Sequence, residues 1–291
     1  MSANSLNQLV QIADGVANAW SRPAPPEAQE ETGFFTDTTL CIGCKACEVA
    51  CKQWNQLPAD GMHLSGNSYD NTVMLSDTTW RHVAFIEQFD GADSGNGDGG
   101  NGNAAGRWLM MSDVCKHCEV APCQEACPTG SILYNEFGNV YVQQDICNGC
   151  GYCVVACPFG VLERNRLDGR AHKCTLCYDR QKIDMTPACA KHCPTESIKF
   201  GPVSKLRQIA KKRVEELHAR GEIDAYLYGA EANGEYSALN SFFLLKDKPI
   251  VYNLPESPRR PVAHMKRNYI FSFAVSVALT AMSAVLFHRG R

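Results

Sequence analysis

The sequence lacks the patterns by which most enzymes are recognised. Its 28 Lys and Arg nearly balance its 31 Asp and Glu, for a formal net charge of −3, so a nucleic-acid-binding surface is not indicated. The glycine-rich run at 91–106 is not followed by G-K-[ST] or by a helix start, which argues against a phosphate-binding loop. No dinucleotide fingerprint, nucleophile or acid–base pair is recognisable. We therefore expect no catalytic site in this chain.

The start of the chain lacks a basic n-region, an apolar h-region and a twin arginine. We expect no secretory or twin-arginine export signal there. We expect residues 1–31 to form an extended arm that lies on a partner or stays partly disordered.

Cysteine, in contrast, is abundant: 16 occur in 291 residues, and all fall into four groups of four. Closely spaced triples cannot all form well-shaped disulfides, and the chain is much longer than the small secreted domains that need them. The groups are therefore expected to bind metal. They are Cys41, Cys44, Cys47 and Cys51; Cys115, Cys118, Cys123 and Cys127; Cys147, Cys150, Cys153 and Cys157; and Cys174, Cys177, Cys189 and Cys193.

The third group, at 147–158, reads C-x2-C-x2-C-x3-C-P, the spacing with which bacterial ferredoxins bind 4Fe–4S clusters. Three cysteines wrap one cluster in a loop, where Gly149 and Gly151 let the backbone approach the sulfides. The fourth cysteine reaches a neighbouring cluster, so one such run implies a second. In the first group Lys52 replaces the proline, so a helix is expected to continue through Trp54.

Zinc is the main alternative, because C-x2-C pairs also build zinc ribbons. Ribbons use two pairs with a longer spacer, whereas triples followed by a fourth cysteine suit a cube better than one tetrahedral ion. His117 lies between ligands of the second group. Since the cysteines of that group are complete, we expect His117 beside the cluster or at the surface.

Apolar and alternating runs predict strands at 80–89 and 108–111 and hairpins at 131–142 and 161–169. Hairpin and cysteine run alternate twice, which indicates an internal repeat of a ferredoxin unit. Residues 203–219 form an amphipathic pattern that predicts a helix ending before Gly221.

Residues 32–56, TGFFTDTTLCIGCKACEVACKQWNQ, closely resemble the iron–sulfur (beta) subunit of membrane-bound respiratory formate dehydrogenases. In that family a GFFTD-like strand leads into this first motif. The order and spacing of the four cysteine groups and a C-terminal membrane segment also match, so the resemblance covers most of residues 32–290. The wider group comprises four-cluster electron-transfer subunits that serve molybdopterin enzymes and some hydrogenases.

The crossover of fourth cysteines predicts that the two middle groups form one two-cluster module, inserted into a second module made by the outer groups. The resemblance implies the same arrangement and four 4Fe–4S clusters. It also implies four ligand sets: Cys41, Cys44, Cys47 and Cys193; Cys51, Cys174, Cys177 and Cys189; Cys115, Cys118, Cys123 and Cys157; and Cys127, Cys147, Cys150 and Cys153.

The expected fold is therefore α+β, with two ferredoxin-like two-cluster modules, one inserted in the other, and a C-terminal transmembrane helix. After the N-terminal arm at 1–31, we expect the first half of the outer module with its glycine-rich loop at 32–107. The inserted module follows at 108–172 and the second half of the outer module at 173–202. An amphipathic helix and connector occupy 203–262, and a membrane anchor occupies 263–291.

Residues 268–287 contain no Asp, Glu, Lys or Arg, and at helical rise they span about 28 Å, close to the hydrocarbon core of a bilayer. Aromatic residues at the start and basic residues at both ends favour a single membrane span over a buried helix. Ser272, Ser276, Thr280 and Ala284 form a stripe of small side chains, which lets another membrane helix approach closely.

The resemblance implies an electron-transfer subunit in anaerobic respiration. Electrons from formate, oxidised at a molybdenum or tungsten pterin site in a large catalytic subunit, would pass through this chain to a membrane cytochrome b subunit and quinone. The alternatives are the same role for a hydrogenase or another molybdopterin oxidoreductase, or a zinc-stabilised membrane scaffold. A count of basic residues would put the cluster domain in the cytoplasm, but the family's subunit crosses already folded, so we expect it in the periplasm.

Overall fold

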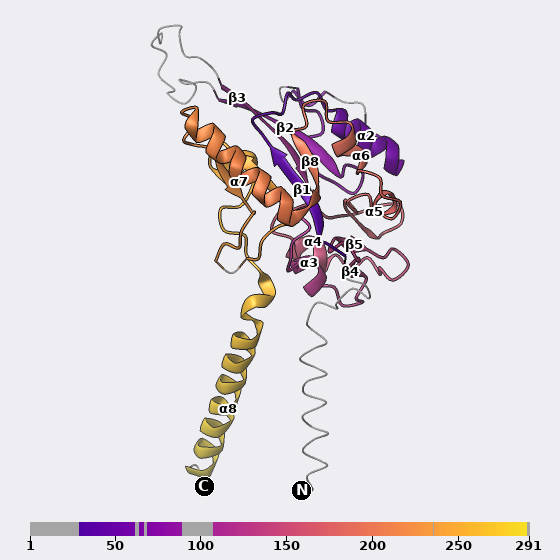
Figure 1. Ribbon diagram of the computed structural model, residues 1–291. Helices are drawn as coiled ribbons and strands as arrows, with labels where there is room; N and C mark the ends of the chain where they lie inside the picture. Colours follow the sequence, from indigo (N-terminus) through magenta and orange to yellow (C-terminus); the bar gives the residue numbers. More distant parts are fainter. Residues whose placement is uncertain (1–28, 62–63, 67–68, 89–106, 235, 290–291) are drawn as a thin grey trace, which may run out of the picture.

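The computed structural model describes residues 29–61, 64–66, 69–88, 107–234 and 236–289. The glycine-rich loop predicted at 91–106 and nearly all of the N-terminal arm lie outside these residues. The described part is mixed helix and strand, as predicted, with one long helix that leaves the body at its C-terminal end (Figure 1).

A four-stranded sheet joins distant parts of the chain. Its strands run in the order β8 (Ile198–Pro202), β1 (Thr32–Asp37), β10 (Ser241–Leu245) and β9 (Tyr226–Tyr228). Strand β1 pairs antiparallel with β8 and parallel with β10. All five residues of β10 are buried, which accounts for the apolar run of four residues that follows Ser241.

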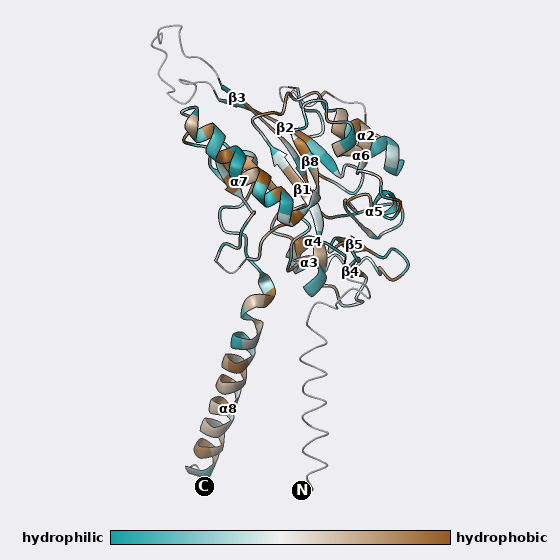
Figure 2. Ribbon diagram, viewed as in Figure 1, coloured by the Kyte–Doolittle hydropathy of each residue, from teal (hydrophilic) through white to brown (hydrophobic). Residues whose placement is uncertain are grey.

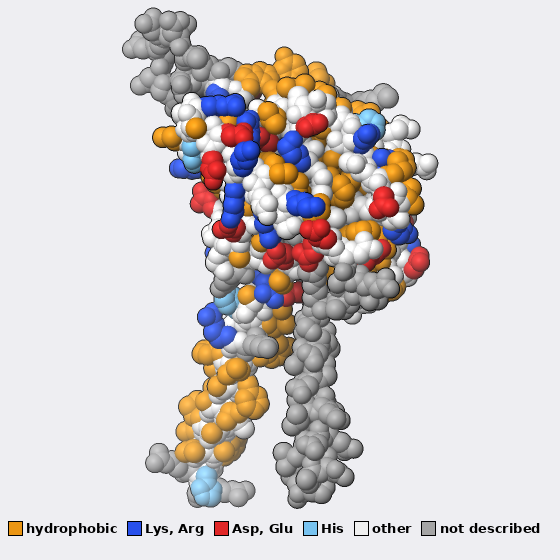
Figure 3. Space-filling model, viewed as in Figure 1, with side chains coloured by type: hydrophobic (Ala, Val, Ile, Leu, Met, Phe, Trp, Pro, Cys, Tyr) orange, Lys and Arg blue, Asp and Glu red, His pale blue; other side chains and the backbone are white. Residues whose placement is uncertain are grey.

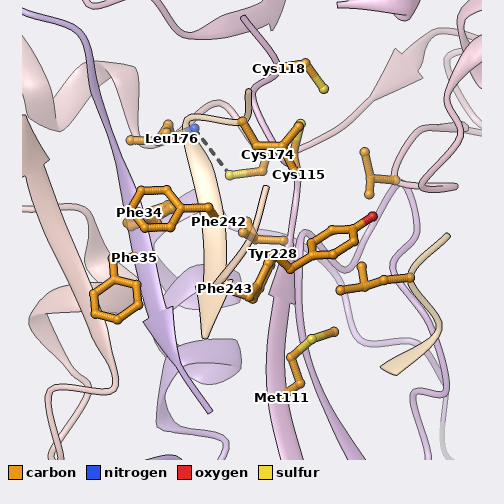
Figure 4. Close-up of a cluster of buried hydrophobic side chains, with 14 of the residues drawn as sticks. Phe34, Phe35, Met111, Cys115, Cys118, Cys174, Leu176, Tyr228, Phe242 and Phe243 are labelled. Atoms are coloured by element: carbon orange, nitrogen blue, oxygen red, sulfur yellow. Dashed lines mark hydrogen bonds between the residues drawn. The ribbon is translucent and has the colours of Figure 1, made fainter. Parts of the chain in front are cut away.

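The core of this sheet is aromatic. The rings of Phe35 and Phe242 stack with centroids 5.5 Å apart, and Phe34 and Phe243 are fully buried beside them (Figure 4). Glycine is required at position 33, because a Cβ there would lie 1.8 Å from the carbonyl oxygen of Asn240. Close approach of these two backbones therefore holds β1 against the segment that leads into β10.

Helix α7 (Val203–Ala219) packs against the sheet, mainly through β1 and β8 (Figure 1). It has the predicted bounds, and Gly221 follows its end with a positive φ of 90°. Val203, Leu206, Ala210 and Leu217 are buried, so the predicted apolar face is confirmed for these positions.

Three antiparallel strand pairs occur at or near the positions predicted for two separate strands and two hairpins. They are β2 (Arg81–Gln88) with β3 (Arg107–Val114), β4 (Ile132–Tyr134) with β5 (Val140–Val142), and β6 (Glu163–Arg164) with β7 (Ala171–His172). The third hairpin was expected from residue 161. Its pairing begins two residues later, at Glu163, and Val161 and Leu162 lie buried in the core.

Short helices stand next to the cysteine groups. They are α2 (Ala46–Asn55), α3 (Pro122–Glu125), α4 (Tyr152–Ala156), α5 (Tyr178–Gln181) and α6 (Ala188–Lys191). Helix α2 continues through Trp54, as the absence of a proline after Cys51 predicted. Helices α2 and α6 pack against each other, and so do α3 and α4.

The last helix, α8 (Met265–Arg289), follows two turns of 3₁₀ helix, η1 (Pro249–Tyr252) and η2 (Pro261–His264). By length and composition, residues Pro261–His288 are suited to cross a membrane, and the protein buries none of this stretch. Figures 2 and 3 show an apolar stalk below the body, with basic side chains near its upper end. Arg260 ties the start of the stalk to α3, because its Nε donates to Glu125 at 2.8 Å.

Candidate metal centres

The four pairs of cysteines spaced four residues apart lie on short helices or directly after them. The pairs are Cys47 and Cys51 on α2, Cys123 and Cys127 at α3, Cys153 and Cys157 at α4, and Cys189 and Cys193 at α6. Residues at i and i+4 lie on the same face of a helix, one turn apart. Helix α2 contains both cysteines of its pair and can therefore direct one sulfur to each of two neighbouring sites. In the other three pairs the second cysteine follows the end of the helix by one or two residues.

Four cysteines, Cys41, Cys44, Cys47 and Cys193, line one pocket, which we call the first site. Cys44 is exposed and Cys47 is buried. Burial raises the pKa of the Cys47 thiol to about 12. Its sulfur lies 3.3 Å from Oγ of Ser112, so strand β3 supplies a hydrogen-bonding group to this site.

The second site comprises Cys51, Cys174, Cys177 and Cys189, all of which are buried. Burial raises the pKa of Cys51 well above its usual value, and the neighbouring thiols of Cys174, Cys189 and Cys177 raise it further. Helix α2 therefore brings the last cysteine of the first group to three cysteines of the fourth group, more than 100 residues later in the chain.

The third site comprises Cys115, Cys118, Cys123 and Cys157, which line a second pocket. Burial raises the pKa of Cys118 to about 12. The Cys118 sulfur lies 3.1 Å from the hydroxyl of Tyr236, a residue that sequence reasoning did not single out. Tyr236 lies shortly before β10, and the sequence around it does not indicate a contact with Cys118.

The fourth site comprises Cys127, Cys147, Cys150 and Cys153. Burial, followed by the charges of the other three thiols, raises the pKa of Cys153 to about 11. The β6–β7 hairpin covers the loop of this site. Arg164 Nη1 donates to the Gly149 carbonyl at 3.0 Å, and the Ala171 N–H donates to the Cys147 sulfur at 3.5 Å.

The four sites form a series in which each adjoins the next. Thiols of the first and second sites interact through Cys47 and Cys189, and those of the second and third through Cys174 and Cys115. Figure 4 shows Cys174 and Cys115 side by side, next to the aromatic core. Helix α4 connects the third site to the fourth. Among the sixteen cysteines only Cys44 and Cys150 are exposed, and they belong to the two ends of the series.

The donor set suits iron–sulfur clusters. Buried thiols with raised pKa values become thiolates only when a bound cation compensates their charge. Within the described residues, no group of three or more His, Cys, Asp and Glu is gathered closely enough to hold a single metal ion. Thiolates around a tetrahedral zinc converge on one ion, whereas those around a 4Fe–4S cube bind four separate irons and stand farther apart. The observed grouping fits the cube.

Basic side chains are buried among the four sites. Lys116 pairs with Asp113, and Lys173 donates to the carbonyl oxygens of Val140 and Cys174. Arg81 is 1% exposed. These residues were missed from the sequence, although Lys116 and Lys173 each adjoin a cysteine ligand. For Arg81 nothing in the local sequence indicated such a position.

His117 lies in the core and lines the cavity of the third site. Its two ring nitrogens have no partner among the described residues. Burial lowers its pKa well below the usual value, and Lys173 and Arg81 lower it further. The ring therefore lies beside the third site, which was one of the two expected positions, and the surface position considered for it was wrong.

Comparison with known proteins identifies the domains. Two profiles described as 4Fe–4S dicluster domain match residues 40–131 and 106–203. Two dicluster domains hold four 4Fe–4S clusters, and the sixteen cysteines fit that number.

Curated relatives cover most of the chain. The nitrate-inducible formate dehydrogenase iron–sulfur subunit of Escherichia coli is 36% identical over 230 residues, 79% of this chain and 74% of the relative. The formate dehydrogenase-O iron–sulfur subunit of the same organism is 39% identical over 244 residues, 81% of this chain and 75% of the relative. A component of the anaerobic dimethyl sulfoxide reductase of Escherichia coli is 35% identical over 179 residues, 60% of this chain and 76% of the relative.

Proposed function

We propose, on the premise that this chain belongs to the family of formate dehydrogenase iron–sulfur subunits, that it conducts electrons released by formate oxidation. The observation that carries this proposal is the series of four cysteine sites, which has an exposed cysteine only at its two ends. The chain is a non-catalytic subunit of an oxidoreductase complex. When bound, its four clusters each accept and pass single electrons.

The ligand sets proposed for these clusters are the four sites described above. Spatial grouping of the thiols supports them, as does the placement of Cys47 and Cys51 one turn apart on α2, which adjoins two sites. The protein's own contribution is burial of the sulfur atoms and donation of hydrogen bonds to them, from Ser112, Tyr236 and the Ala171 N–H. Both influence the reduction potential of a cluster.

The proposed modules follow the same grouping. Residues 32–107 and 173–202 would form the outer module and hold the first and second sites, and residues 108–172 would form the inserted module and hold the third and fourth. Pairing of β1 with β8 supports this division, because it joins the two halves of the outer module on either side of the inserted one. The remaining segments would be the arm at 1–31, the helix and connector at 203–262, and the anchor at 263–291.

The direction of transfer follows from the position of the stalk. Helix α3 contributes Cys123 to the third site and contacts the connector through Glu125 and Arg260, so the inserted module is the one nearest to α8 (Figure 1). Its terminal cysteine Cys150 would face a membrane cytochrome b subunit. Cys44, at the opposite end of the series, would face a large catalytic subunit with a molybdenum or tungsten pterin.

The stalk would anchor the protein in the cell membrane by a single span, with the cluster domain in the periplasm. Protease treatment of intact spheroplasts tests this orientation. A periplasmic cluster domain is digested without detergent, whereas a cytoplasmic one survives until the membrane is opened. Protection in intact spheroplasts, together with digestion after lysis, would contradict the proposed side.

The function is tested on the complex purified without oxygen. We expect this chain to contribute about sixteen non-haem irons and sixteen acid-labile sulfides, since each of four clusters holds four of each. We also expect bleaching of the cluster absorbance when formate is added. Bleaching by hydrogen but not by formate would instead support the alternative of a hydrogenase partner. A colourless, iron-free complex that contains zinc would contradict the electron-transfer role.

Matched variants at the first and fourth sites test the proposed direction of electron transfer. Cys150→Ser should remove the fourth cluster, so that formate still reduces the other three clusters but no longer reduces quinone. Cys44→Ser should impair the first cluster and block reduction of the remaining three by formate. Reduction of quinone by the Cys150→Ser complex at the normal rate would contradict an exit through the fourth site.

A further inference from the structure

Arg81 is a buried cation whose hydrogen-bonding capacity is only half used. It opens strand β2 and is 1% exposed. Its Nη1 donates to the carbonyl oxygen and the Oγ of Ser112, at 3.2 and 3.1 Å, and its guanidinium carbon lies 4.8 Å from the centre of the Phe34 ring. Within the described residues, Nε and Nη2 have no partner.

The groups that face this guanidinium are cysteines of two different sites. Cys47 belongs to the first site, and Cys51, Cys174 and Cys189 belong to the second. Burial alone would lower the pKa of Arg81, but the four thiolates outweigh this effect and hold the pKa above its usual value. Arg81 in turn favours the charged form of Cys41, Cys47 and Cys51. The side chain therefore lies between the first and second sites.

A buried charge of this kind requires an anionic partner. An isolated charge in the protein interior is strongly unfavourable, and each unsatisfied buried N–H adds a further penalty. Lys116 has Asp113 as its ion-pair partner. For Arg81, no carboxylate of the described residues lies within ion-pair distance. An oxidised 4Fe–4S cluster with four thiolates carries a charge of about −2. Two such clusters would supply the missing partner.

We propose that Arg81 is a positioning residue that holds one fixed positive charge between the first and second clusters and donates from Nε and Nη2 to their inorganic sulfides. This inference rests on the proposed ligand sets. A fixed cation stabilises the additional electron on either cluster, so it raises the reduction potential of both. The guanidinium keeps its proton throughout, so an electron supplied by the donor enters either cluster without proton uptake at this position.

The test is an EPR-monitored redox titration of the complete complex with Arg81→Met, which removes the charge and the donors but keeps an unbranched side chain. We expect the midpoint potentials of the two outer-module clusters to shift downward and those of the two inserted-module clusters to stay unchanged. Arg81→Lys, which keeps the charge without the planar donors, should shift them less. Unchanged midpoints in an Arg81→Met complex that retains all four clusters would overturn the proposal.

Arg107→Met is the matched control. Arg107 lies at the other end of the same β2–β3 ladder and pairs with Asp247 and Gln88 instead of thiolates. Removal of its charge should leave all four midpoints unchanged. Equal downward shifts in the Arg107 and Arg81 variants would mean that distant charge acts as strongly as the buried one, which would also overturn the proposal.

A measurement on the unsubstituted complex covers the case in which Arg81→Met does not assemble. Protein labelled with ¹⁵N-arginine and partly reduced with dithionite should show a weak ¹⁵N coupling to an outer-module cluster in pulsed EPR. Its absence at both outer-module clusters would overturn the direct contact. Dithionite replaces the natural electron donor, so the ¹⁵N coupling does not depend on whether formate reduces the complex. If formate proves not to be the donor, the test of Arg81 remains valid.

Discussion

Gly149 and Gly151 offer a sharp test of how the fourth site is held together. Both lie in the loop that carries Cys147, Cys150 and Cys153, and both have a positive φ, of 70° and 80°. A Cβ at Gly149 would lie 2.1 Å from the carbonyl oxygen of Gly169, whereas a Cβ at Gly151 would meet nothing within 4 Å. The two alanine variants therefore share the backbone strain and differ in the contact.

The magnitudes follow from this difference. A left-handed conformation costs a residue with a Cβ about 1–2 kcal/mol, and this is the whole cost expected for Gly151→Ala. Gly149→Ala must in addition displace the β6–β7 turn by about 1 Å, and such overpacking typically costs about 1–3 kcal/mol more. Since 1.4 kcal/mol is a factor of ten, we expect the fourth cluster to be lost about ten times more readily from Gly149→Ala.

The assay is anaerobic release of iron to a chelator under mild denaturant. Gly149→Ala should release about four of its sixteen irons in a fast phase, because only one of four 4Fe–4S clusters is affected, and Gly151→Ala should lack this phase or show it about ten times more slowly. Equal rates for the two variants would refute the role of the Gly169 contact. Release of all sixteen irons together would refute the assignment of this loop to a single cluster.

Three further predictions follow from the same structure. Tyr236→Phe removes the hydroxyl 3.1 Å from the Cys118 sulfur, so the midpoint potential of the third cluster should fall while the other three stay constant in a redox titration; an unchanged third midpoint would contradict this. Phe242→Ala removes a fully buried ring that stacks on Phe35 and should lower the free energy of unfolding by about 3–5 kcal/mol. Denaturant titration measures this loss, with the exposed Ile223→Ala as control. Similar losses in both variants would argue against the proposed core. Removal of iron should expose nine buried cysteines and unfold the protein. The circular dichroism signal should be lost, and the thiols should react with Ellman's reagent. Retention of the native spectrum would show that the clusters are dispensable for folding.

The sequence was informative where chemistry depends on spacing. The cysteine groups, the hairpins next to them and the amphipathic pattern of α7 are local, so periodicity and ligand spacing predicted them. Ile209 shows the limit of periodicity, because it continues the apolar pattern of α7 but is 45% exposed. A helix pattern gives the direction of a side chain but not how far the neighbouring sheet extends.

Contacts between distant segments were beyond such reasoning. Arg81 opens an ordinary-looking strand, and its position between two sites depends on pairing of β2 with β3, across the glycine-rich stretch, and on burial behind Phe34. Tyr236 reaches Cys118 from more than 100 residues away. Neither position has a local propensity that differs from that of a surface arginine or a core tyrosine, so only the three-dimensional arrangement reveals their role.

The place of β1 in the central sheet has a consequence for biosynthesis. This strand directly precedes the first cysteine group, yet both of its neighbours, β8 and β10, are translated much later. The first cluster likewise needs Cys193 for its proposed ligand set. A growing chain therefore cannot close its earliest metal site until most of the polypeptide has left the ribosome, and β10 is followed after a short connector by the apolar α8. Completion of the first cluster must accordingly wait until Cys193 and the partner strands of β1 have been translated.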